Sequence, residues 1–322
     1  MQDVIKVMVD GLWRQGDKNL AVRLTAVDGE PLPVWQPGAH IDVHLPCGLI
    51  RQYSLTGECV TRESYLICVS RENASRGGSR YIHDTLRPGQ TLWISSPRNL
   101  FPLQPAQQVL LMAAGIGITP LYAMALKLEQ SGTPFELHYY VKSRRDAAFL
   151  SGLTQTFIHG VCQIYCSDEQ PDTRNTLLRI LSTPHAGLHL YTCGPVGFMT
   201  AVRETAVAKG WSEAAVHSEA FQPPAVPTPA ENEGTFTVTL ASSGETWPVP
   251  ASQTIAQVLQ ENGVAVPLSC EMGLCGACLT PVIEGRVDHR DTVQTDEEKS
   301  AALQQIALCC SRSHSASLVI DL

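Results

Sequence analysis

Three patterns of apolar and polar residues follow one another along the chain, and each predicts a different kind of structure. In the first third, short runs alternate between apolar and polar residues with a period of two, as the strands of a half-buried sheet do. Gly and Pro turns separate these runs, which lie at 40–45, 51–55 and 65–69. We expect an antiparallel β-barrel here, because a small sheet of short strands can bury its apolar face by closing on itself.

The middle third has the pattern of an α/β nucleotide-binding domain. Residues 108–114 form a continuous apolar run, which is typical of a strand buried on both faces of a parallel sheet. The turn Gly115-Ile-Gly117-Ile-Thr119-Pro120 follows and leads into a predicted helix at 121–130, with Pro120 at the first helical position. Two further strands are expected at 135–141 and 188–192.

The C-terminal part begins with two alternating segments, 236–240 and 245–249, which predict a hairpin. Thr254 then caps a predicted helix at 255–262. Before this part lies a stretch with four prolines and almost no large apolar residue, which cannot form a packed element. We therefore expect a multidomain chain with domains at 1–103, 104–222 and 234–322 and a proline-rich linker at 223–233.

Composition and charge exclude several classes of protein. The formal charge of −8 and the pI near 5.7 argue against a nucleic-acid partner, because phosphates require a basic surface. We expect no membrane span, since no apolar run approaches the roughly 20 residues that a helix needs to cross a bilayer. The eleven cysteines are an odd number, and the N-terminus does not resemble a signal peptide. We therefore expect reduced cysteines and a cytoplasmic location.

Five of the cysteines are spaced like the ligands of an iron–sulfur cluster. Cys270, Cys275 and Cys278 form the pattern C-x4-C-x2-C, and the pair Cys309-Cys310 follows later. In plant-type ferredoxins, this loop and one distant cysteine hold a [2Fe-2S] cluster. A structural zinc site is disfavoured, because it would need a second short Cys or His hook. Spacing alone leaves both Cys309 and Cys310 open as the fourth ligand.

The order of elements around the cysteine loop supports the same interpretation. Two strands, a helix and then the loop occur in the order of a β-grasp ferredoxin domain. Gly273 and Gly276 would let the loop fold tightly, so that backbone N–H groups point at sulfur.

Three turns are candidates for binding phosphate or nucleotide. Arg76-Gly77-Gly78-Ser79 precedes a short predicted helix at 80–86, and the turn at 115–120 precedes another; the first N–H groups of a helix attract anions. Taken alone, each is also compatible with a plain polar turn, and the second lacks the third glycine of the dinucleotide fingerprint. Cys193-Gly194-Pro195 ends a predicted parallel strand, where the ligands of α/β domains collect.

Together and in this order, these segments resemble the phthalate dioxygenase reductase family over the whole chain, and the reductase subunits of vanillate demethylase and carnitine monooxygenase are similar. The segments that carry the resemblance are Arg51-Gln-Tyr53-Ser54, Arg76-Gly-Gly-Ser79, Gly115-Ile-Gly-Ile-Thr-Pro120, Cys193-Gly-Pro195, Glu219-Ala-Phe221, the cysteine loop, Asp288-His-Arg-Asp291 and the C-terminal end at Leu322.

The resemblance implies three cofactors, FMN, NADH and a [2Fe-2S] cluster. Tyr53 would lie against the flavin ring, Ser54 near its reactive edge and Arg51 near its phosphate. The FMN phosphate would lie in the turn Arg76-Gly77-Gly78-Ser79, and no insertion for the adenine of FAD is evident there. Thr119 and Phe221 would face the flavin and the nicotinamide, and the turn Cys193-Gly194-Pro195 would lie under the nicotinamide.

The remaining roles also come from the resemblance. The expected catalytic residues are Ser54, Thr119, Cys193 and Phe221, and Gly115, Gly117 and Pro120 complete the cofactor-binding set. By position relative to Ser311-Arg312, the family's fourth cluster ligand matches Cys309, and it joins Cys270, Cys275 and Cys278. The resemblance favours NADH, whereas the basic cluster Lys142-Ser-Arg-Arg-Asp146 keeps NADPH open.

The combination of cofactors predicts a function. Nicotinamide gives up two electrons together as hydride, whereas an iron–sulfur cluster accepts one, so a flavin has to stand between them. We expect an NADH-dependent oxidoreductase, the reductase component that feeds a terminal Rieske non-haem iron oxygenase acting on a small aromatic, phthalate- or vanillate-like metabolite. Two alternatives are a non-enzymatic iron–sulfur carrier or redox sensor, and a reductase that serves another acceptor such as a haem oxygenase.

Overall fold

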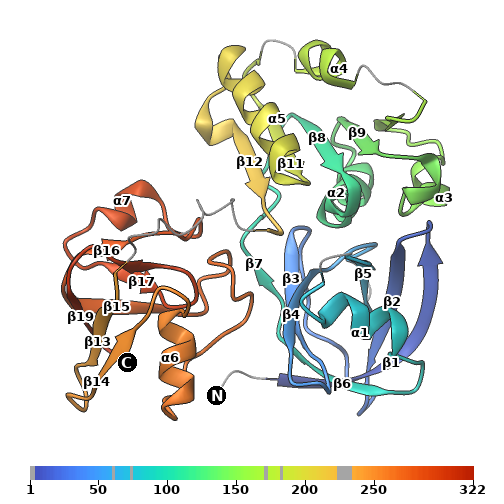
Figure 1. The fold of residues 1–322 in the computed structure, drawn as a ribbon. Coiled ribbons are helices and arrows are strands. Elements are labelled where there is room, and N and C mark those ends of the chain that lie inside the picture. Colours follow the sequence, from blue (N-terminus) through green and yellow to red (C-terminus); the bar gives the residue numbers. More distant parts are fainter. Residues whose placement is uncertain (1–3, 60–61, 73–74, 170–172, 182–183, 223–233) are drawn as a thin grey trace. The chain divides into compact units, whose positions relative to one another are not determined.

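The structure, a computed structural model, describes residues 4–59, 62–72, 75–169, 173–181, 184–222 and 234–322. The chain divides into two compact units, Met1–Phe221 and Gln222–Leu322, and each has its own hydrophobic core (Figure 1). The first unit contains a barrel followed by an α/β part. The expected linker at 223–233 lies outside the described residues, and the expected boundary after residue 103 stays a prediction. None of the helices in the described ranges is long and apolar enough to span a bilayer.

The barrel is a seven-stranded antiparallel sheet with the strand order β4-β3-β6-β1-β2-β5 and with β7 paired to β3. Its strands are β1 (Val4–Gln15), β2 (Asn19–Ala26), β3 (Ala39–His44), β4 (Ile50–Ser54), β5 (Ser64–Ser70), β6 (Thr91–Ser95) and β7 (Arg98–Asn99). A bridge between Leu55 and Ile67 joins the end of β4 to β5 and closes the barrel. The three predicted strands are confirmed as β3, β4 and β5, with shifts of one residue at some ends. The short helix α1 (Gly78–Asp84) begins two residues earlier than predicted.

The α/β part has a parallel sheet with the strand order β10-β9-β8-β11-β12. Its strands are β8 (Gln108–Ala114), β9 (Phe135–Val141), β10 (Gly160–Cys166), β11 (Leu188–Cys193) and β12 (Val216–Glu219). The chain moves outward from β8 to β10 and then returns to the other side of β8, so the strand order reverses between β8 and β11. Ligands of open α/β sheets bind at the carboxyl ends of the strands at such a reversal.

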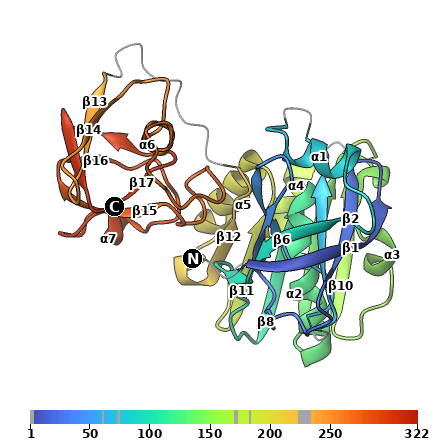
Figure 2. The same ribbon diagram turned by 90° about the horizontal axis from the view of Figure 1, so that it is seen from below.

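Helices cover both faces of this sheet. The larger helices are α2 (Ile118–Ser131) and α5 (Val196–Ala208), and the shorter ones are α3 (Leu150–Leu153) and α4 (Thr173–Ile180); η1 (Gly115–Gly117), η2 (Arg144–Asp146) and η3 (Glu213–Ala215) are 3₁₀ turns. Helix α2 packs on the face that carries Leu111, and α5 packs on the face that carries Met112 (Figure 2). The helix predicted at 121–130 is α2, which begins earlier, at Ile118, and ends at Ser131. Pro120 is therefore the third residue of the helix and not the first. Proline is tolerated there, because the first N–H groups of a helix have no partner within the helix.

The second unit is built on a five-stranded sheet with the order β14-β13-β19-β15-β17 and a separate pair, β16-β18. The strands are β13 (Phe236–Leu240), β14 (Thr246–Val249), β15 (Leu279–Glu284), β16 (Val287–Asp288), β17 (Gln305–Ala307), β18 (Arg312–Ser313) and β19 (Ser317–Ile320); the helices are α6 (Ile255–Glu261) and α7 (Asp296–Lys299). The predicted hairpin and helix are confirmed. Thr254 caps α6 as predicted, and it forms a reciprocal capping box with Gln257.

Candidate cofactor sites

Strand β4 brings Arg51 to the turn that was predicted to bind phosphate. The Arg51 Nη2 donates to the Arg76 carbonyl over 2.9 Å. Gly78 lies directly against the Arg51 side chain, and a Cβ at position 78 would come within 2.6 Å of the Arg51 Cγ. Gly77 has a φ of +94°, which side chains rarely adopt. The two glycines therefore let a cationic side chain and a backbone turn approach each other closely.

The turn has an internal support that the sequence did not reveal. The Ser75 hydroxyl accepts hydrogen bonds from the Gly77 N–H, over 3.1 Å, and from the Ser79 hydroxyl, over 3.0 Å. Arg76 and Arg80 are exposed beside it. A fixed turn surrounded by guanidinium groups fits a phosphate monoester such as that of FMN, because charged hydrogen bonds to phosphate are strong. Tyr53, two residues after Arg51, packs against the barrel core, and burial raises the pKa of its phenol.

Two turns of the α/β part meet where the strand order reverses. Gly115 and Gly117 follow β8, and Cys193 ends the neighbouring strand β11. A Cβ on Gly117 would overlap with the Cys193 carbonyl group, and one on Gly194 would lie 2.8 Å from the Ala114 Cβ. These glycines are therefore required for the two turns to pack together. Thr119 is buried in the first turn of α2, and its hydroxyl donates to the Ile116 carbonyl over 3.0 Å.

A buried carboxyl links the barrel to this edge of the sheet. Glu219 is the last residue of β12 and pairs in register with Cys193 of β11. The Ser54 hydroxyl at the end of β4 donates a hydrogen bond to the Glu219 carboxylate, and the other oxygen, Oε2, is buried without a hydrogen-bond partner in the described structure. Burial raises the pKa of Glu219 to about 8, and the bond from Ser54 opposes this shift. Burial raises the pKa of Cys193, and the charge of Glu219, where that carboxyl is ionised, raises it further, so the thiol stays protonated.

Ser54 of the barrel and Cys193 and Glu219 of the parallel sheet form a small polar site. Cys193 keeps its proton near neutral pH, whereas Glu219, with a pKa of about 8, can hold or release one. Phe221 follows two residues after Glu219 and packs against the core of the α/β part. The predicted residues from β4, from the end of β8 and from the end of β11 are therefore brought to one region.

The four predicted cluster ligands converge in the second unit. Register pairing of Leu279 in β15 with Ala307 in β17 brings Cys278 next to Cys309. The side chains of Cys278 and Cys309 are hydrogen bonded, and so are those of Cys270 and Cys275. Cys270, Cys278 and Cys309 are buried.

Backbone N–H groups point at these sulfur atoms, as predicted. The Gly273 N–H donates to the Cys309 Sγ over 3.3 Å, and the Ala277 N–H donates to the Cys275 Sγ over 3.4 Å. Gly273 and Gly276 have φ values of +71° and +72°. Two facing pairs of thiols inside a ring of amide donors fit the ligand set of a [2Fe-2S] cluster.

Comparison with known proteins supports this assignment. A 2Fe-2S iron-sulfur cluster binding domain matches residues 238–313. The chain is 45% identical over 306 residues to the vanillate O-demethylase oxidoreductase of Pseudomonas putida, covering 93% of this chain and 94% of that one. It also matches the structure of phthalate dioxygenase reductase with 35% identity and a TM-score of 0.78, over 99% of this chain and 98% of that one. The chain belongs to the phthalate dioxygenase reductase family.

Membership in the phthalate dioxygenase reductase family confirms the predicted fold and class of activity. The chain is an oxidoreductase, a flavin and iron–sulfur reductase component of an oxygenase system. The alternative of a non-enzymatic carrier is therefore wrong. The name of one relative refers to haem: it is the heme-dependent oxidative N-demethylase beta subunit of Ectopseudomonas mendocina. This chain is 38% identical to it over 292 residues, which cover 90% of each chain.

Sequence reasoning missed Glu219 and Ser75, which the structure places beside the predicted site residues Ser54 and Ser79. Glu219 lies in the segment that contributed to the resemblance, but only Phe221 of that segment was assigned a role. No local signal marked Glu219, because strand β12 was not predicted and its pairing with β11 is seen only in the structure. Ser75 had none either, because its role depends on how the turn folds back on itself.

Proposed function

We propose that this chain passes electrons from NADH, through FMN and a [2Fe-2S] cluster, to a Rieske non-haem iron oxygenase that acts on a small aromatic acid. FMN would be held by Arg51, Tyr53, Ser54 and the turn at 76–79. The nicotinamide would enter between the turns at 115–120 and 193–195. The flavin supplies the ability to take two electrons together and release them one at a time.

The residues of the chain have complementary tasks in this scheme. Ser54, Thr119, Cys193 and Phe221 would surround the reacting edge of the flavin, and Glu219 would hold a proton next to Ser54. Because Cys193 is buried and protonated, it contributes a neutral surface instead of a thiolate. Cys270, Cys275, Cys278 and Cys309 would bind the cluster.

We propose Cys309 as the fourth ligand because the two adjacent cysteines differ in their surroundings. Cys309 is hydrogen bonded to Cys278 and accepts the Gly273 N–H. Cys310 has its Sγ 3.9 Å from the Ala307 carbonyl and 3.8 Å from the Ser311 hydroxyl. It also packs against Gly273, where a Cβ would lie 2.5 Å from the Cys310 Sγ. The thiol of Cys310 therefore packs against Gly273 and the Cys309 thiol, whereas Cys309 also reaches Cys278.

Acidic residues at the edge of the sheet favour NADH over NADPH. Asp168 and Glu169 are exposed just after β10, where their carboxylates and the Cys166 thiol lie within 4.8 Å of one another. A carboxylate at this edge can accept a hydrogen bond from the ribose 2′-hydroxyl of NADH and would repel the 2′-phosphate of NADPH. The cations Arg144 and Arg145 of η2 follow the neighbouring strand, β9.

The observation that carries the proposal is the whole-length similarity to the vanillate O-demethylase oxidoreductase, together with a complete set of predicted site residues. The test is to isolate the oxygenase that accepts electrons from this chain and to record its absorption and EPR spectra. A Rieske [2Fe-2S] signal without haem is expected. A haem Soret band would instead support the second candidate, a haem-dependent oxygenase, which the similarity to the heme-dependent N-demethylase subunit favours.

A further inference from the structure

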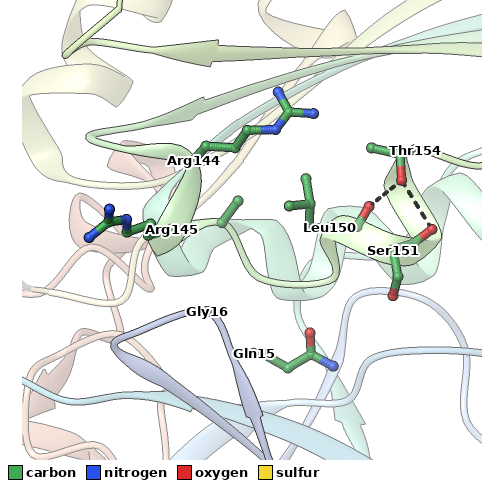
Figure 3. Close-up of a pocket in the computed structure, with 8 residues that line it drawn as sticks. Gln15, Gly16, Arg144, Arg145, Leu150, Ser151 and Thr154 are labelled. Atoms are coloured by element: carbon green, nitrogen blue, oxygen red, sulfur yellow. Dashed lines mark hydrogen bonds between the residues drawn. The ribbon is translucent and has the colours of Figure 1, made fainter.

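A hollow of about 510 Å³ lies between the tip of the β1–β2 hairpin and the segment that follows β9 (Figure 3). Its volume is in the range of sites that bind small molecules. None of its lining residues comes from the turns at 76–79, 115–120 or 193–195. The residues that line it are Gln15, Gly16, Arg144, Arg145, Ala147, Leu150, Ser151 and Thr154.

The two walls of this pocket are fixed to each other by backbone contacts. The Asp17 N–H donates to the Arg145 carbonyl over 2.8 Å, and a Cβ on Gly16 would lie 2.5 Å from the same oxygen. The Phe149 N–H donates to the Gln15 Oε1 over 2.9 Å. The hairpin of the barrel is therefore docked onto the start of α3, and the pocket exists only while it is docked.

The pocket also adjoins a strained residue. Phe149 precedes α3 with a φ of +57°, which is uncommon for a residue with a side chain. Its ring stacks on Tyr122 of α2, with ring centres 4.7 Å apart and planes inclined by 9°. Backbone strain of this kind costs free energy and persists where surrounding contacts enforce it, often next to ligand sites.

The polar groups of the lining are donors. Arg144 and Arg145 are cations, and neither has an ion-pair partner among the described residues. The Gln15 Oε1 already accepts the Phe149 N–H, which leaves its amide hydrogens for the pocket. No carboxylate lines the pocket, since the nearby Asp146 faces Lys18, 3.4 Å away. In Figure 3 the Arg144 side chain extends toward the side of the lining that holds Leu150 and Thr154, whereas the Arg145 side chain points the opposite way.

One wall of the pocket is apolar. Ala147 and Leu150 line the hollow. The Thr154 hydroxyl is already committed to the Leu150 and Ser151 carbonyls (Figure 3). We propose that this pocket binds a small organic acid, with its carboxylate on Arg144 and Gln15 and its apolar body against Ala147 and Leu150. A guanidinium group is well suited to such a ligand, because its planar donors match a carboxylate.

The proposal can be tested by calorimetric titration of the full-length, cofactor-loaded protein with benzoate. Arg144→Gln should weaken benzoate binding about tenfold or more, the effect of losing one charged hydrogen bond, and Arg144→Lys should restore part of it. The matched control is Lys142→Gln. It also removes one positive charge, but Lys142 lies two residues before Arg144 and does not line the pocket. It should leave benzoate affinity within about twofold of the original protein.

Four results would overturn the proposal. They are an absence of benzoate binding, an equal loss of affinity in Lys142→Gln, equally tight binding of inorganic phosphate, and competition between benzoate and NADH in steady-state kinetics. Equal loss in the control would reduce the effect to general charge, and equal affinity for phosphate would show that the apolar wall has no role. Competition would assign the pocket to the coenzyme site.

Discussion

Replacing Glu219 by Gln should change how the stability of the protein depends on pH. One oxygen of the Glu219 carboxyl is buried, and burial raises the pKa of this group from an ordinary value of 4.5 to about 8. The folded protein therefore binds a proton that the unfolded chain releases. The contribution of Glu219 to stability is fully present below about pH 4.5 and is lost as the pH rises toward 8, because ionising the buried group costs free energy.

The size of this effect follows from the shift. Each unit of pKa corresponds to about 1.4 kcal/mol, so a shift from 4.5 to about 8 gives an upper limit of roughly 5 kcal/mol at pH 8 and above. Gln cannot ionise, but its amide oxygen can still accept the hydrogen bond from Ser54. The difference in unfolding free energy between Glu219→Gln and the original protein should therefore be small near pH 5 and should grow in favour of the variant up to pH 8.

The assay is urea unfolding of the FMN-loaded protein at intervals between pH 5 and pH 8.5. Glu213→Gln is the matched control, because Glu213 lies in the preceding 3₁₀ turn with a side chain that is 90% exposed. The control should follow the pH profile of the original protein. If Glu219→Gln also follows that profile, Glu219 ionises at an ordinary pKa and the account of a proton held beside Ser54 is wrong.

Three further predictions concern the cofactors. Cys309→Ser should lose the cluster iron while FMN stays bound, whereas Cys310→Ser should keep it; iron analysis that gave the opposite pattern would reverse the ligand assignment. Arg76→Ala should weaken FMN by roughly 1.5 to 3 kcal/mol in equilibrium titration, and an unchanged affinity would remove Arg76 from the phosphate site. Replacing Asp168 and Glu169 together by Asn and Gln should raise kcat/KM for NADPH relative to NADH, whereas an unchanged ratio would show that the ribose binds elsewhere.

Most of the fold could be predicted because its signals are local. The apolar run at 108–114 became β8, and the alternating segment at 236–240 became β13. The start of α2 was predicted too late, because Pro120 was taken as the first residue of the helix. The first turn of a helix tolerates proline at several positions. Strands β10 and β12 were not predicted; they lie at the edges of the sheet, and their residues are mostly only half buried, so they lack a continuous apolar run.

The site could be predicted only in part, for a related reason. Arg51 and the turn at 76–79 were assigned separately and are joined in the structure by a hydrogen bond. The bond between Ser54 and Glu219 joins residues far apart in sequence, and no local pattern encodes it. The choice between Cys309 and Cys310 also depends on which thiol the register of β15 and β17 turns toward Cys278.

The most direct test of the proposed electron path compares the full chain with a chain that ends at Phe221, where the first compact unit ends. The shortened protein should keep FMN and should oxidise NADH with ferricyanide at a rate close to that of the full chain. Its reduction of cytochrome c should be largely lost, because that acceptor takes single electrons from the cysteine-bound cluster. Full cytochrome c reduction by the shortened protein would contradict the order NADH, FMN, [2Fe-2S], oxygenase.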